Sequence, residues 1–214
     1  GAKKFFFIDS TRIDKLSNKK KYREIYIKIW YPVEKSEKLN YDLYLLDYPV
    51  KVLADIFSSN GLVPELLEQY RKMNTFTTSN LEIKDVSTKF PVIIFNPGFY
   101  FGIADFYTSL IENLASNGYI VCCINHPYEQ PYVETSNGSV LLKKKKAQLA
   151  YFQYYIADKL QFRKPTSKEK TQKITLNYLR KLKLLNKANT RWTKDSQFFI
   201  DYITKIKKNK NNEN

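Results

Sequence analysis

The sequence predicts an α/β fold with a mostly parallel sheet, and two observations predict it. Residues 90–126 contain an apolar run, a tight turn, an amphipathic segment and a second apolar run, which is the pattern of a βαβ unit. The chain of 214 residues is 43% hydrophobic and 15% aromatic, which is enough for a sizeable core. We expect one domain over residues 1–206 and a disordered basic tail over 207–214.

The first confident strand lies at residues 23–32, REIYIKIWYP, because apolar and polar positions alternate there. Ile25, Ile27 and Ile29 should point to one face of the sheet, with Lys28 on the other. The preceding residues 1–21 are polar and basic apart from a short apolar patch, Phe5 to Ile8.

Residues 49–73 predict one or two helices, interrupted at Asn60-Gly61. Pro64 suits the first turn of the second of these helices, where its missing N–H costs nothing.

The central unit begins with the apolar run at residues 91–95, which is typical of a strand covered on both faces. The turn signal Asn96-Pro97-Gly98 follows. Asp105 is positioned to cap the next helix, and Asn117-Gly118 should end it. Residues 119–124 then predict the second strand.

The turn after the first of these strands is the candidate site. It lies at a carboxyl end of the sheet, which is where open α/β sheets place their sites. Its candidate residues are Asn96 and Gly98.

The remaining third of the chain predicts a hairpin-like turn at Asn137-Gly138 and then helices. We expect a helix over residues 149–160 and a long helical pattern over residues 171–208, weakened at 186–189.

The net charge of +15 is confined to the C-terminal third: residues 141–214 hold 20 Lys and Arg against five Asp and Glu, whereas residues 1–140 hold 16 of each. A basic segment of this kind can contact an anionic membrane or nucleic acid. The simpler interpretation is a solvated helical face with a frayed tail. We find no nucleic-acid-binding module, so nucleic acid is the less favoured partner.

Metal and cofactor sites are not expected. The chain has one histidine and two cysteines, Cys122 and Cys123, which are adjacent in a predicted strand and therefore cannot easily pair. No GxGxxG or GxxxxGK[ST] motif is present, and no apolar run reaches the roughly 18 residues that span a bilayer. The compartment stays open, because a removed leader is compatible with the Gly-Ala start.

Several segments occur in an order that resembles a known family. They are Trp30-Tyr31-Pro32, residues 90–99 (FPVIIFNPGF), residues 114–121 (LASNGYIV), Asn125-His126-Pro127-Tyr128, residues 191–195 (RWTKD) and residues 198–202 (FFIDY). Together they resemble the platelet-activating factor acetylhydrolase branch of the α/β-hydrolase fold, the plasma-type, lipoprotein-associated phospholipase A2-like group. The resemblance extends from about residue 11 to 206.

This resemblance implies an enzyme that releases short or oxidised acyl chains from phospholipids with a Ser-Asp-His triad and without a metal or cofactor. It also implies that the backbone N–H of Phe99 contributes to an oxyanion hole, where losing one donor costs on the order of 10²–10³ in rate. By the same resemblance Asn96, Gly98 and Tyr100 belong to the site turn, and Gly98 would allow the backbone to approach the substrate. Many family members have His-Gly where this chain has Pro97-Gly98.

The triad itself is missing from this sequence. Gly-x-Ser-x-Gly occurs nowhere, and the nearest segment, residues 137–141, lacks the second glycine. His126 precedes the place where the nucleophile should be, whereas the triad order in this fold is Ser, acid, His. We therefore expect His126 at the site rim rather than as the base. The nucleophile, the acid and the base are all expected outside this chain.

The expected fold is thus a partial α/β-hydrolase fold that lacks the nucleophile strand and later strands and carries long C-terminal helices. Strand 91–95 would then lie at an open apolar edge, which invites a second polypeptide, self-association or repacking by the helices. The function we expect is an ester hydrolase that is split or truncated before its serine and inactive alone.

An alternative is a non-catalytic binding module that uses residues 141–214 on anionic lipid or nucleic acid. A remnant without independent function is a third interpretation.

Overall fold

The computed structural model describes residues 1–34, 39–57, 63–82, 89–142, 145, 148, 149, 152, 155 and 167–212. They belong to two compact units, Gly1–Leu142 and Lys143–Asn214. The single domain over residues 1–206 stays a prediction. Most of the helix expected at residues 149–160 falls outside the described residues.

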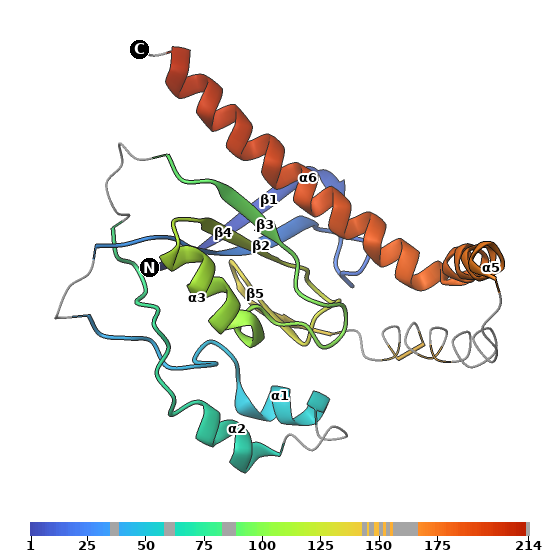
Figure 1. The fold of residues 1–214 in the computed structure, drawn as a ribbon, viewed down its shortest axis with the longest axis horizontal. Helices are drawn as coiled ribbons and strands as arrows, with labels where there is room; N and C mark the ends of the chain where they lie inside the picture. The colour runs from blue at the N-terminus through green and yellow to red at the C-terminus, as the bar shows by residue number, and fades with distance from the viewer. Residues whose placement is uncertain are drawn as a thin grey trace. The chain divides into compact units, whose positions relative to one another are not determined.

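The first unit is built on a four-stranded sheet with the order β1-β2-β4-β3 (Figure 1). Its strands are β1 (Ala2–Ile13), β2 (Tyr22–Trp30), β3 (Val92–Phe95) and β4 (Ile120–Asn125). Within these described strands, β3 pairs with β4 alone and therefore forms one edge of the sheet.

The prediction of a mostly parallel sheet is wrong. Only β3 and β4 run parallel, as the βαβ pattern predicts, whereas β1–β2 and β2–β4 are antiparallel. The parallel prediction failed because β1 was not recognised: it forms a hairpin with β2 through a short connection, and such connections join antiparallel strands. The sequence revealed only its apolar patch, Phe5 to Ile8.

The alternation predicted in β2 is confirmed by what its two faces meet. Lys28 and Trp30 lie opposite Cys123 and Val121 of β4, on the face that packs against the helix of the βαβ unit. The core on this face includes Trp30, Ala104, Ile111, Ala115, Val121 and Cys123. Because β2 has a strand on each side, nearly its whole length is buried, including its charged residues.

The helix of the βαβ unit begins differently from its prediction. A short 3₁₀ turn, η2 (Ala104–Tyr107), precedes α3 (Thr108–Ser116), and Asp105 lies inside this turn instead of capping the helix. Its carboxylate forms an ion pair with Lys28, and this contact is more favourable than a cap at the helix end. The predicted end is confirmed, since Asn117 is the C-cap and Gly118 follows with φ +89°.

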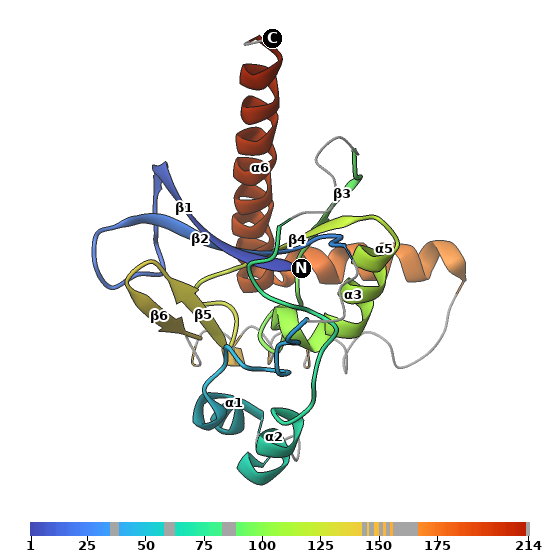
Figure 2. The same cartoon turned by 90° about the vertical axis from the view of Figure 1, so that its left-hand side faces the viewer.

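A second small core lies around α1 (Val50–Phe57) and α2 (Pro64–Tyr70), which Figure 2 shows away from the main sheet. Leu53 of α1 and Leu67 of α2 pack there with Ile103. Pro64 occupies the first turn of α2, as predicted. The predicted turn at Asn137-Gly138 is also confirmed, because it joins β5 (Tyr132–Thr135) to β6 (Gly138–Leu141).

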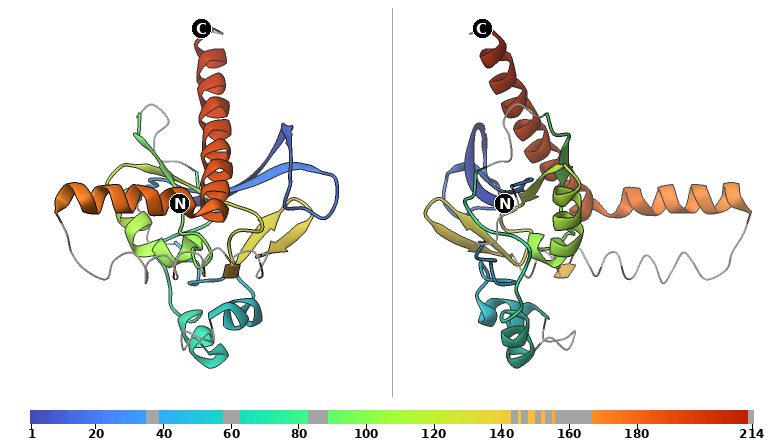
Figure 3. Two further views of the ribbon diagram at one scale, coloured as in Figure 1. Left: turned by 90° about the vertical axis from the view of Figure 1, so that its right-hand side faces the viewer. Right: turned by 60° about the vertical axis from the view of Figure 1, so that its left-hand side comes forward.

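The second unit contains α5 (Lys168–Lys181) and α6 (Lys183–Asn212), which Figure 3 shows running in different directions. The break lies at Leu182, whose ψ of 60° is not helical, and not at residues 186–189 as the sequence suggested. Ser167 caps α5 by accepting a hydrogen bond from the N–H of Lys170. The backbone of α6 continues as a helix to Asn212, where the sequence predicts a disordered tail from residue 207.

Candidate functional site

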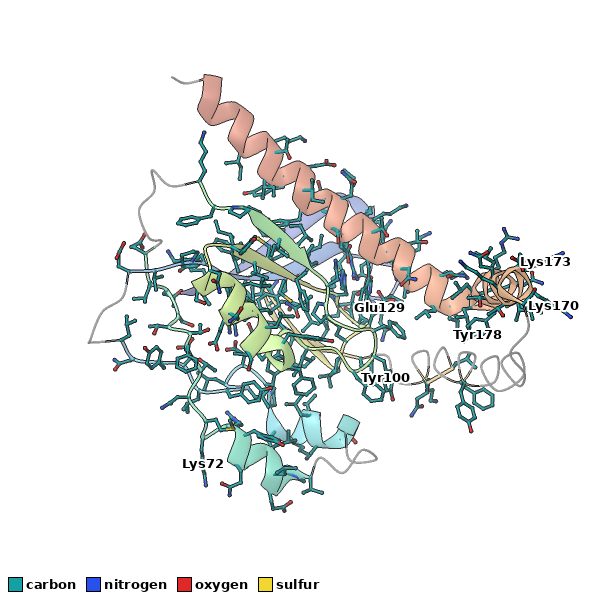
Figure 4. All side chains as sticks on the ribbon, in the orientation of Figure 1. Lys72, Tyr100, Glu129, Lys170, Lys173 and Tyr178 are labelled. Atoms are coloured by element: carbon teal, nitrogen blue, oxygen red, sulfur yellow. The ribbon has the colours of Figure 1, made fainter. Side chains whose placement is uncertain are left out.

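The turn after β3 and the loop after β4 lie side by side, because the two strands are parallel neighbours and end at the same edge of the sheet. The N–H of Tyr100 donates to the carbonyl oxygen of Glu129 at 3.1 Å, which ties the two segments together. Figure 4 labels both residues, which lie close together at this end of the first unit. The structure therefore places the predicted turn, residues 96–100, at a junction of two loops.

His126 forms a second link between these two segments. Its Nε2 lies 2.8 Å from Oδ1 of Asn96, and its backbone N–H donates to Oε1 of Gln130 at 2.7 Å. An amide oxygen only accepts, so Nε2 carries the proton in this arrangement. The side chain of His126 is fully buried, so the prediction that it lies at the rim of the site is wrong. It contacts the turn from inside the protein.

The turn itself is closed by its own backbone. Phe101 donates to the carbonyl oxygen of Phe99 at 2.9 Å, and Gly102 donates to that of Gly98 at 3.0 Å. Tyr100 has a φ of 72°, a left-handed conformation that tyrosine rarely adopts. Such strain persists only where surrounding contacts enforce it, and here the bond to Glu129 does so.

Gly102 is required by packing, and the sequence did not single it out. A Cβ at this position would lie 2.1 Å from the carbonyl oxygen of Gly98, which no real structure permits. At Gly98 the nearest atom to an added Cβ is Oη of Tyr107 at 3.6 Å, an ordinary contact. The two backbones can approach each other because residue 102 is glycine.

A buried ion pair contacts the loop after β4. Arg23 of β2 is 2% exposed, lies 3.2 Å from the carboxylate of Asp14 and donates to the carbonyl oxygen of Pro127 at 3.4 Å. Because Pro127 follows His126 directly, this contact restricts the segment that carries the histidine.

A second ionic cluster fixes the start of α3. Nζ of Lys28 lies 2.8 Å from Asp105 and 3.0 Å from Asp47, while Lys4 bridges Asp47 at 2.5 Å and Glu134 at 3.2 Å. Burial alone would lower the pKa of Lys28, but the two aspartates raise it above its ordinary value. Lys28 is therefore a permanent cation in the sheet.

This cluster has one signal in the sequence: Lys28 occupies a position in the alternating pattern of a central strand, where a buried lysine needs a carboxylate.

The two cysteines are buried and unpaired with each other, as expected. Burial raises the pKa of the Cys122 thiol to about 12, so neither its position nor its protonation suits a nucleophile. Among the described residues, no group of three or more His, Cys, Asp or Glu side chains could hold a metal ion. No helix in the described part of the chain is long and apolar enough to cross a membrane.

The turn at 98–102 lies at the carboxyl end of β3, and the N–H groups of Tyr100, Phe101 and Gly102 all donate to backbone carbonyl oxygens. The only histidine of the chain is engaged with Asn96.

Comparisons with known proteins agree with this architecture. The family model described as platelet-activating factor acetylhydrolase, isoform II, matches residues 12–212. A solved ferulic acid esterase from Streptomyces cinnamoneus has a similar fold, with a TM-score of 0.50 and 22% sequence identity over 78% of this chain. The chain spans 47% of that esterase, which is less than half of its length. A search of curated proteins found no match.

Proposed function

The chain belongs to the platelet-activating factor acetylhydrolase isoform II family, and on that premise we propose that it supplies the oxyanion side of a carboxylic ester hydrolase site. The substrate class is a lipid or another ester with a short acyl chain. In this proposal the backbone N–H of Phe99 donates to the oxyanion, while Asn96, Gly98 and Tyr100 shape the turn.

One observation carries the proposal: the turn is held rigidly from two sides at the carboxyl ends of β3 and β4. The contacts Tyr100–Glu129 and Asn96–His126 fix it before any substrate binds. Preorganisation is what an oxyanion hole requires, because donors that must reorient during the reaction lose much of their effect.

The proposed mechanism needs a nucleophile from another segment, since Gly-x-Ser-x-Gly is absent from residues 1–214. A serine on a strand beside β3 would attack the ester carbonyl and release the alcohol, and water would then release the acid. The edge of β3 is where such a strand would pair. The nucleophile comes from a further segment of the same polypeptide or from a second polypeptide.

The first test measures hydrolysis of p-nitrophenyl acetate by residues 1–214 alone. We expect no turnover above that of buffer. Turnover by this chain that survives replacement of every serine would overturn the serine mechanism, and any robust turnover would overturn the assignment of a half-site.

The second test joins or mixes the chain with any Gly-x-Ser-x-Gly segment that is encoded beside it. Replacing Phe99→Pro removes the N–H and should lower kcat by roughly 10²–10³ with little change in KM. Phe99→Ala is the matched control, because it removes the ring but keeps the donor. Equal losses in both variants would show that the ring, and not the N–H, matters.

A second candidate function is contact with an anionic membrane surface through α5. Leu176 and Leu179 are 55% and 46% exposed, and Lys173 and Arg180 lie one turn from Leu176 on the same side of the helix. Figure 4 shows Lys170 and Lys173 on this helix. Exposed leucines flanked by basic residues are typical of helices that lie in a membrane interface.

Vesicle sedimentation tests this second candidate. The chain should bind vesicles that contain phosphatidylserine and should be released by added salt. Leu176→Ser together with Leu179→Ser should weaken binding, while the same change at the exposed Leu43 should not. Binding that is equal for neutral and anionic vesicles would contradict it.

A further inference from the structure

A cavity of about 730 Å³ lies in the first unit, away from the turn at residues 96–100. The end of α2 and the segment up to Phe76 form one side, and residues of η2 and α3, from Phe106 to Ser116, form the other. This volume is in the range of small-molecule sites, roughly 300–1,000 Å³. None of its described lining residues belongs to the proposed oxyanion turn.

Four aromatic rings line this cavity, together with Met73 and several polar side chains. Tyr44, Tyr70, Phe76 and Phe106 all contribute, and the rings of Tyr44 and Tyr70 meet edge to face with centroids 6.4 Å apart. Phe76 is 83% exposed, so its ring gains almost no hydrophobic free energy when the chain folds. The four rings therefore give the cavity an apolar, aromatic part of its wall.

Glu112 is the one charged residue among the described residues that line the cavity. Its Oε1 accepts two hydrogen bonds, from the N–H of Phe76 at 2.8 Å and from Oγ1 of Thr77 at 2.7 Å. These bonds hold the carboxylate beside the aromatic wall. Both donors are neutral groups, so neither of these two bonds is an ion pair.

We propose that this cavity binds a monovalent organic cation, a substituted ammonium group carried on an apolar body. Ring faces attract a cation through their quadrupole, and a fixed carboxylate adds a charge of the right sign. A neutral apolar ligand would instead desolvate Glu112 without a partner, which is unfavourable. A calcium site takes six to eight oxygen ligands, commonly from several carboxylates, whereas Glu112 is the one carboxylate among the described lining residues.

The test titrates the full chain with benzyltrimethylammonium and, separately, with 2-methyl-1-phenylpropan-2-ol, which has nearly the same shape and no charge. Binding is followed by NMR shifts of the Phe76 amide and the surrounding resonances. We expect the cation to bind at least about tenfold more tightly than the alcohol, which corresponds to roughly 1.4 kcal/mol. Equal affinities would overturn the proposal without any variant being made.

Variants then identify the groups responsible. Glu112→Gln keeps an oxygen that can accept from Phe76 and Thr77 but removes the charge, so the cation should lose about tenfold in affinity and the alcohol should not. Glu65→Gln, on the exposed surface of α2, is the matched control and should change neither. Loss with both variants would indicate a general effect of net charge and would contradict the site.

The aromatic wall is tested with Tyr70→Leu, which leaves the carboxylate in place. Its expected loss of cation affinity is roughly 2- to 30-fold, the range of a single cation–π contact. Because Tyr70 is 37% exposed, this variant should fold even if Glu112→Gln does not. Unchanged cation affinity in Tyr70→Leu would show that the rings do not contact the ligand and would overturn the proposal.

Discussion

Nε2 of His126 lies 2.8 Å from Oδ1 of Asn96, and this contact joins the loop that follows β4 to the turn that follows β3. The two residues are 30 positions apart in the chain. They meet because β3 and β4 are parallel neighbours whose carboxyl ends share one edge of the sheet. The histidine thereby contacts the candidate site through the side chain of Asn96.

Replacing Asn96→Leu should loosen the turn. The variant leaves the buried Nε2–H of His126 without this acceptor, so we expect a loss of about 1–3 kcal/mol in the free energy of unfolding. Hydrogen exchange at the Tyr100 amide should also become faster, because its bond to Glu129 depends on the same turn. Asn96→Asp keeps an acceptor oxygen and should restore slow exchange. If both variants exchange at the wild-type rate, the contact does not order the turn.

The glycines at 98 and 102 should respond in opposite ways to alanine. Gly102→Ala forces a Cβ into the backbone of Gly98 and should cost about 1–3 kcal/mol or more of folding stability. Gly98→Ala meets nothing closer than 3.6 Å and should be nearly neutral. Urea denaturation of the two variants provides the comparison. A destabilised Gly98→Ala with an unaffected Gly102→Ala would contradict the geometry of the turn.

The cluster around Lys28 should dominate the electrostatic part of stability. Lys28→Met leaves Asp105 and Asp47 without their shared cation, and removing one member of a buried pair costs about 3–5 kcal/mol. Lys3→Met is the matched control, because its partner Glu82 is almost fully exposed and such pairs contribute roughly 0–1 kcal/mol. Thermal unfolding of both variants tests the difference, and equal shifts in Tm would contradict it.

The same cluster predicts how stability depends on pH. Burial would raise the pKa of Asp47, but Lys28 and Lys4 hold it below its ordinary value of 3.8. A carboxyl whose pKa is lower in the folded state stabilises the protein above the unfolded value, and this contribution is lost as the pH falls through the folded value. Stability should therefore decline below about pH 4. In Asp47→Asn that decline should be shallower, as measured by urea midpoints against pH.

The edge of β3 should promote association, because its outer side has no partner strand among the described residues. We propose that a second copy or a second polypeptide pairs there. Val92, at 48% exposure, is the residue to replace: Val92→Lys should reduce concentration-dependent association in sedimentation velocity. Val63→Lys, at a similarly exposed position outside any strand, should have no effect. A chain that stays monomeric at all concentrations would contradict self-association.

The sequence by itself determined the elements whose signals are local. Alternation at residues 23–32 predicted β2, and the apolar runs at 91–95 and 119–124 predicted β3 and β4. Pro64 and Asn117-Gly118 marked helix boundaries because their backbone preferences are intrinsic. The order of these segments was also enough to point to the family and to the turn at residues 96–100.

Only the tertiary structure decided what depends on residues far apart in the chain. The directions of β1 and β2 required their pairing to be seen, and so did the sheet's mostly antiparallel character. The role of Asp105 changed from helix cap to partner of Lys28, 77 positions away, because a buried cation attracts a carboxylate more strongly than a helix end does. The need for glycine at 102 and the burial of His126 likewise arise where two loops converge, which local sequence does not encode.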